Sequence, residues 1–108
     1  MRISKRLWNK KIDVYEYGKT VDEYGVSRKG YTKIIENMKC NIQPESSEKA
    51  EKEYGYKVEC TNKVFCNVEP LIKESSIIMW NNQTYEVKQI IRWNDYWILL
   101  IYEKGVSI

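Results

Sequence analysis

Residues 77–103 of the chain read IIMWNNQTYEVKQIIRWNDYWILLIYE, and this stretch decides the fold. It opens with four apolar residues, and Asn81-Asn82-Gln83 then supplies turn chemistry, because Asn tolerates a positive φ angle. From residue 85 to residue 92, Tyr, Val, Gln and Ile alternate with Glu, Lys, Ile and Arg, which is the two-residue period of a strand. Asn94-Asp95 predicts a second turn, and residues 96–102 are apolar on both faces, as is typical of a central strand. The stretch therefore predicts a three-stranded meander.

Upstream of this meander, the same period predicts three further strands. Residues 11–17 and 31–43 are expected to form the first two, joined by a long polar hairpin loop over residues 18–30. Glu36 interrupts the apolar face of the second strand, which predicts a bulge or an edge position there. Residues 57–68 are expected to form the third strand. Its buried face would comprise Val58, Cys60, Val64, Cys66 and Val68. About six strands with almost no helix predict an all-β fold, either a small antiparallel β-barrel or a sandwich.

Residues 44–56 form the most hydrophilic segment and interrupt the strand pattern. Pro44 ends the second strand, and the segment that follows has the signals of a short helix. Ser46 or Ser47 can cap its N-terminus, and Gly55 stands where a left-handed C-terminal residue belongs. The segment has no apolar stripe, however, and a helix this short is marginal in water. The sequence therefore leaves both a long polar loop and a short helix open.

At 108 residues the chain has the size of a single domain. We expect a barrel over residues 11–103 with the polar insertion at 43–56, preceded by a basic N-terminal arm over residues 1–10. The net charge of +3 is too small to indicate a nucleic-acid-binding domain. No apolar run has the length of a transmembrane helix, and the N-terminus has no signal-peptide core. We therefore expect a protein made in the cytoplasm, with no membrane partner.

The composition disfavours catalysis, and we expect no enzyme activity, no metal site and no cofactor. The chain has no histidine, which removes the commonest general base and a common metal ligand. It also has no nucleophile motif and no phosphate-binding glycine loop. The three cysteines are expected to act as small buried hydrophobic residues, with Cys40 able to face Cys60 or Cys66 across a strand pair.

The order of these features resembles that of the head-closure proteins of tailed bacteriophages and prophages, which join head to tail and are also called stoppers. The resemblance covers roughly residues 10 to 103 and rests on the order of the features, since no single motif is specific. The matching stretches are DEYG at 22–25, CNIQP at 40–44 running into the charged segment 45–53, KVFC at 63–66, IIMWNNQTYEV at 77–87 and WNDYW at 93–97.

The resemblance implies a small β-barrel that assembles, in six or twelve copies, into a ring beneath the portal and adaptor proteins. The other neighbour would be a tail-completion or tail-tube protein, and double-stranded DNA would pass through the channel without sequence-specific binding. The polar segment is expected to reach that channel. Its charged residues are Glu45, Glu48, Lys49, Glu51, Lys52 and Glu53. Their net negative charge would repel the phosphate backbone, which suits a conduit through which DNA slides.

The basic N-terminal arm is a candidate surface for contacts with neighbouring subunits or partner proteins, although a solvated arm is the simpler interpretation. The contact residues we expect are Arg2, Lys5, Arg6 and Trp8. The leading hypothesis is thus a structural component of the virion neck, made in the bacterial host.

Two alternatives stay open. The chain could form a collar or tail-completion piece in a headless, phage-tail-like particle. It could instead be a nucleic-acid-binding barrel of the OB or SH3-like type, which stacks bases on aromatic side chains in a basic groove. The residues closest to such a groove are Lys88, Arg92, Trp93 and Tyr96.

Overall fold

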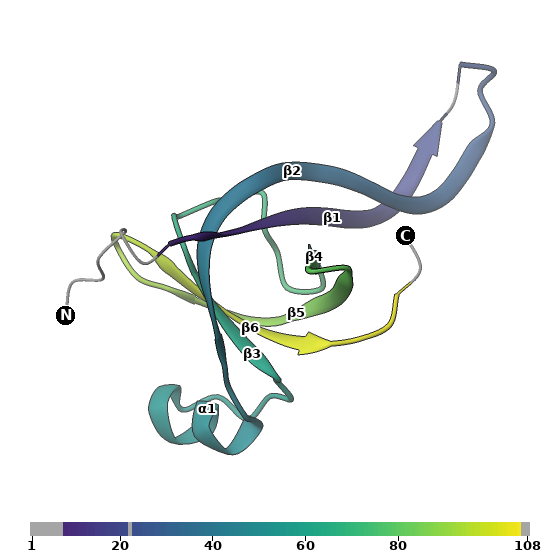
Figure 1. Cartoon of the computed structure of the whole chain (residues 1–108). Helices are drawn as coiled ribbons and strands as arrows, with labels where there is room; N and C mark the ends of the chain where they lie inside the picture. Colours follow the sequence, from purple (N-terminus) through teal and green to yellow (C-terminus); the bar gives the residue numbers. More distant parts are fainter. Residues whose placement is uncertain (1–7, 22, 107–108) are drawn as a thin grey trace.

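Six antiparallel strands close into a barrel in the computed structural model of the chain, which describes residues 8–21 and 23–106 (Figure 1). The strands are β1 (Lys10–Val21), β2 (Ser27–Pro44), β3 (Asn62–Cys66), β4 (Ile77–Trp80), β5 (Gln83–Arg92) and β6 (Trp97–Glu103). Their order around the barrel is β1-β2-β3-β6-β5-β4. One helix, α1 (Ser47–Tyr54), is inserted between β2 and β3. The predicted all-β fold is confirmed as a barrel, and the polar segment at 44–56 contains a short helix.

The C-terminal meander has the turns that the sequence predicts. Asn81 and Asn82 join β4 to β5 with φ angles of 53° and 60°, the left-handed pair of a two-residue hairpin turn. Between β5 and β6, the Trp93 backbone N–H donates to the Tyr96 carbonyl over 3.1 Å. Strand β6 lies between β3 and β5 and is buried on both faces, as expected of a central strand.

Two apolar clusters lie on opposite sides of the barrel wall. The inner cluster fills the barrel, and its members include Ile12, Val14, Cys40, Val64, Cys66, Ile78, Val87, Ile90, Leu99 and Ile101. The outer cluster lies between the wall and helix α1 and consists of Ala50, Cys60, Ile91, Ile98 and Leu100, with Tyr54, Val58, Phe65 and Tyr96 packed against them. Because the barrel interior is filled by side chains, the barrel itself is a core and no channel.

The strict alternation predicted along β5 is wrong beyond Val87. A register shift between Val87 and Gln89 inserts one extra residue relative to β6. A bulge of this kind exchanges the two faces of the strand. Ile90 therefore joins the inner cluster, and Ile91 joins the outer one.

The strand predicted over residues 57–68 is wrong at both ends, because β3 covers only Asn62–Cys66. Val64 and Cys66 point into the barrel as predicted. Cys60 is buried in the outer cluster instead, since residues 57–61 bring the chain back from α1 and do not continue the strand. Val68 lies beyond the strand end and is 42% exposed.

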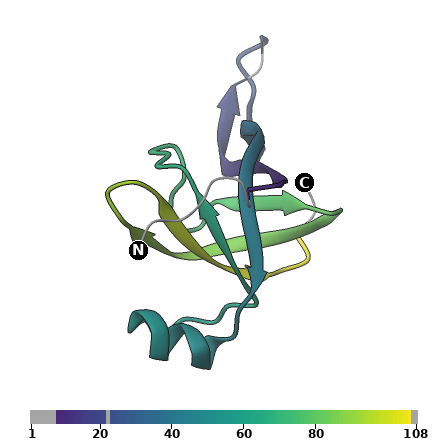
Figure 2. The same cartoon turned by 60° about the vertical axis from the view of Figure 1, so that its left-hand side comes forward.

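The long loop predicted over residues 18–30 is also wrong. Strands β1 and β2 continue as a paired ribbon to Val21 and Ser27, and this ribbon projects from the barrel as an arm (Figures 1 and 2). Helix α1 projects from the opposite side of the barrel in both views. Of the bulge or edge position predicted at Glu36, the structure has the bulge, because the register between Ile12 and Val14 shifts by one extra residue on β2. At this bulge Asn37 has a φ of 53°, and its N–H donates to Asp13 Oδ1 over 2.9 Å.

The register places Cys40 directly across from Cys66, with both thiols fully buried in the barrel. Burial raises the pKa of each thiol to about 12. In the unfolded chain a thiol ionises near pH 8.5. Each cysteine therefore contributes stability that is fully present below about pH 8.5 and is lost as the pH rises toward about 12.

We expect the free energy of unfolding to fall by about 1.4 kcal/mol per pH unit for each thiol over that window. Urea denaturation between pH 8 and 11 measures this slope. The matched control is the Cys40→Val/Cys66→Val variant, whose slope should be visibly smaller because the remaining tyrosines and lysines are unchanged. An identical slope in the two proteins would contradict the burial of the thiols.

Candidate assembly surfaces

Helix α1 is fixed to the outer wall of the barrel by capping and by one buried side chain. Ser46 Oγ accepts from the Lys49 N–H over 3.2 Å, and Gly55 adopts the left-handed conformation with a φ of 78°. Ala50 is fully buried in the outer cluster. Ser47 Oγ also accepts from the Cys60 N–H over 3.2 Å, which ties the helix to the returning chain. The helix is thus positioned by the fold, although its sequence is almost entirely polar.

Lys63, a buried lysine on β3, binds helix α1 and the residue that precedes its N-cap. Lys63 Nζ lies 3.5 Å from Glu45 Oε2 and 3.4 Å from Glu53 Oε2, and it donates to the Tyr54 hydroxyl over 3.3 Å. The ammonium also lies 5.5 Å from the centre of the Tyr54 ring and 5.6 Å from that of Phe65, within cation–π range. Burial lowers the pKa of Lys63, while Tyr54, Glu45 and Glu53 raise that pKa by more, so the net shift is upward. Lys63 therefore carries its charge at neutral pH.

The structure does not place all six predicted channel residues at the surface. The Glu45 side chain is only 1% exposed, and its partner is Lys63. Glu53 is partly exposed but also binds Lys63, which leaves the outer face of α1 less acidic than the sequence implies. Glu48 pairs with Lys52 at 3.7 Å, as the i,i+4 spacing predicts. The burial of Glu45 has no signal in the sequence, because it depends on a lysine eighteen positions further along the chain.

Glu51 pairs with Lys57 at 3.8 Å, and Lys49 is exposed on the same helix. The exposed charges of the segment are therefore those of Glu48, Lys49, Glu51, Lys52 and Glu53.

Of the predicted N-terminal contact residues, Arg2, Lys5 and Arg6 lie outside the described residues. Trp8 lies within them and is 7% exposed, so little of its ring is accessible to a partner in the single subunit.

The start of β1 nevertheless contributes to a basic rim of the barrel. Lys11 and Lys39 are direct cross-strand partners on the outer wall, and both are exposed, as is Lys10. Cross-strand partners place the ends of four strands in one row along this rim. Lys10 pairs with Cys40, Cys40 with Cys66, and Cys66 with Trp97. The β5–β6 loop therefore lies on the same rim. Sequence reasoning missed Lys39, because its position opposite Lys11 depends on the register of the ribbon.

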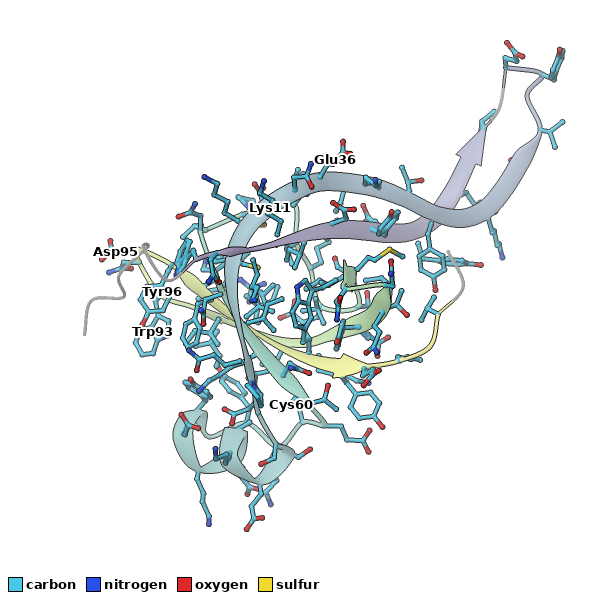
Figure 3. All side chains as sticks on the ribbon, in the orientation of Figure 1. Lys11, Glu36, Cys60, Trp93, Asp95 and Tyr96 are labelled. Carbon is cyan, nitrogen blue, oxygen red and sulfur yellow. The ribbon has the colours of Figure 1, made fainter. Side chains whose placement is uncertain are left out.

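The rim loop carries aromatic side chains. Trp93 is 51% exposed, and its ring centre lies 6.5 Å from that of Tyr96, which in turn lies 6.4 Å from that of Phe65. Figure 3 shows Trp93, Asp95 and Tyr96 at the end of the molecule away from the arm, with Lys11 toward the same side.

The cations expected in a nucleic-acid-binding groove are engaged within the subunit. Lys88 Nζ lies 2.8 Å from Glu86 Oε1. Arg92 contacts both carboxylate oxygens of Glu74 at 3.4 Å and stacks over the Trp97 ring at 5.1 Å. These two residues therefore do not form a free basic groove with the rim aromatics.

A polar cleft of about 320 Å³ lies at the base of the arm. Its charged residues pair with one another, Lys73 with Glu16 at 3.5 Å and Lys104 with Glu86 at 3.6 Å. The described residues contain no cluster of three or more His, Cys, Asp or Glu able to hold a metal ion. Over residues 8–21 and 23–106 there is also no helix long and apolar enough to cross a membrane. The surface features that stand out in the described part of the chain are the arm, the basic rim and helix α1.

The Lys63 cluster makes a direct prediction for stability. Lys63→Met should lower the free energy of unfolding by about 3–5 kcal/mol, because it leaves the Glu45 carboxylate buried without a counter-charge. The double variant Glu45→Leu/Lys63→Met should recover most of that loss, since it removes both charges. Denaturant unfolding measures both effects.

The exposed pair Glu48→Gln/Lys52→Met serves as the control and should change stability by less than about 1 kcal/mol. Additive losses in the Glu45→Leu/Lys63→Met variant would show that the two buried side chains do not depend on each other.

The described fold is similar to a solved structure of a phage-like element protein. XkdH of the phage-like element PBSX from Bacillus subtilis superposes with a TM-score of 0.58 at 15% sequence identity, over 88% of this chain and 93% of that chain. At this identity the similarity establishes a shared fold. No protein-family model matches the sequence, and no curated protein sequence matches it.

Proposed function

We propose that this protein is a structural component of a phage or phage-like particle. More specifically, we propose a head-closure or neck protein that forms a ring between the portal–adaptor complex and the tail. The observation that carries the proposal is the fold shared with XkdH over nearly the whole of both chains. The order of sequence features that resembles the head-closure proteins supports the same assignment.

The filled barrel interior determines how such a protein would build a DNA channel. Fully buried side chains such as Val14, Leu99 and Ile101 occupy the barrel, so DNA cannot pass through one subunit. A channel must instead be enclosed by several copies arranged in a closed ring of six or twelve, each contacting the next through two different faces. A rigid barrel with projecting elements is well suited to this task, because the core fixes the position of each contact surface.

Helix α1 is the element we assign to the channel side. Its exposed charges include three glutamates and two lysines, and this excess of negative charge would repel DNA phosphates weakly. The helix is held rigidly by Lys63 and Ala50, so it can line a conduit at a defined radius. The same construction would also serve as a collar in a headless, phage-tail-like particle. The protein would be located in the particle after being made in the host cytoplasm.

Deletion of the gene from its phage or prophage tests the proposal. We expect filled heads and separate tails in electron micrographs, with infectivity restored by a plasmid copy. In a headless particle the same deletion should give tails that lack their end structure. Intact particles with normal infectivity after deletion would refute the proposed function.

A further inference from the structure

The arm formed by β1 and β2 extends beyond the barrel without support from other strands. Strand β4 pairs with β1 only over Asp13–Tyr15, and β3 pairs with β2 only from Cys40 onward. The ribbon beyond Tyr15 is therefore two-stranded, and both of its outer edges are unpaired among the described residues. An isolated two-stranded ribbon is at best marginally stable in water, and open edges are sites for association.

The side chains of the arm also indicate that it is marginally stable by itself. Gly18 lies directly opposite Gly30, so this step of the ribbon has no side-chain contact across it. Beyond it, Val21 and Val26 are exposed, and Tyr24 is 83% exposed at the tip. Large apolar groups at the end of a projecting ribbon are costly in water and indicate a surface that is covered in the assembled state.

Glu23 is the outermost described charge of the arm and is opposite in sign to the rim, whereas Lys19 and Lys29 form an exposed cross-strand pair further back along the arm. Glu23 is exposed beside Tyr24. On the rim, Lys11 and Lys39 lie directly across from each other, an arrangement of like charges that weakens a strand pair and that a nearby carboxylate would stabilise. Exposed Trp93 lies on the same rim and offers an aromatic surface.

We propose that the arm tip of one copy docks on the basic rim of the next copy, with Glu23 against Lys11 and Lys39 and Tyr24 toward Trp93. The arm and the rim lie far apart in one subunit, whose longest dimension is 51 Å, so the arm cannot reach its own rim (Figures 1 and 3). A contact between two different surfaces is head-to-tail, and repeated head-to-tail contacts form a ring when the rotation between neighbouring copies closes. The inference rests on the proposed ring for its biological setting, but the contact can be tested by itself.

Site-directed cross-linking provides the first test. Val26→Cys and Lys10→Cys proteins, mixed and treated with a short bismaleimide, should give a cross-linked dimer that contains one chain of each kind, because both positions are exposed beside the proposed contact and leave its side chains in place. The native thiols are almost fully buried and do not compete. The matched control replaces Lys10→Cys by Lys52→Cys on the exposed face of α1 and should give at least tenfold less product.

Charge exchange provides the second test. Glu23→Lys and Lys39→Glu should each weaken self-association about five- to tenfold, as measured by sedimentation at high protein concentration. Both changes in one chain should restore most of the affinity, because every head-to-tail contact then again pairs one acidic with one basic side chain. Lys52→Glu is the control and should leave self-association unchanged.

These outcomes separate the inference from the proposed function. Particles that contain the protein but give no cross-link between positions 26 and 10, or a cross-link from position 26 to a different protein, would overturn the arm contact and leave the neck role standing. Loss of DNA affinity in Lys39→Glu, with self-association unchanged, would show that the rim binds phosphate and would also overturn it. Particles that assemble normally without the protein would refute the neck role, and cross-linking of the concentrated protein would still decide the contact.

Discussion

Strand β6 is apolar on both faces, and the need to bury both faces determines the rest of the architecture. Its inner side chains, Leu99 and Ile101, close the barrel, while Ile98 and Leu100 face outward. Burying one Leu or Ile side chain contributes about 1.5–3 kcal/mol, so an uncovered outer face would cost several kcal/mol. Helix α1 supplies the cover, and this explains why an all-β chain carries one helix at this point.

The helix has little apolar surface of its own, so an ion cluster completes its attachment. Ala50 reaches the outer cluster, but most of the helix is charged. Lys63 stands on the outer face of β3 and draws Glu45, Glu53 and Tyr54 toward the barrel. A buried charge is tolerated only when it is paired, which makes the position of the helix depend on this one side chain. The surface that remains is less acidic and more rigid than a free polar loop would be.

The features that could be predicted are those that depend only on residues close together in the sequence. The Asn81-Asn82 turn, the double-faced β6 and the irregularity at Glu36 follow from turn chemistry and periodicity. The bulge after Val87 could not be predicted, because one inserted residue changes the face of every later side chain without altering the composition. The Lys63–Glu45 pair and the Lys11–Lys39 pair also could not be predicted, since each depends on which strands pair and in which register.

The arm was missed for a different reason, and that reason bears on its role. Periodicity detects strands by their buried face, but no described side chain of the ribbon beyond Tyr15 is fully buried within the subunit. A segment that forms strands without a core to pack on gains little from folding by itself, because the entropy of ordering its backbone is not offset by burial. Its exposed Val21 and Tyr24 would be an aggregation hazard on a free monomer. A neighbouring subunit that packed against these strands would bury the surface that a single subunit leaves exposed, and this burial would offset the entropy of ordering them.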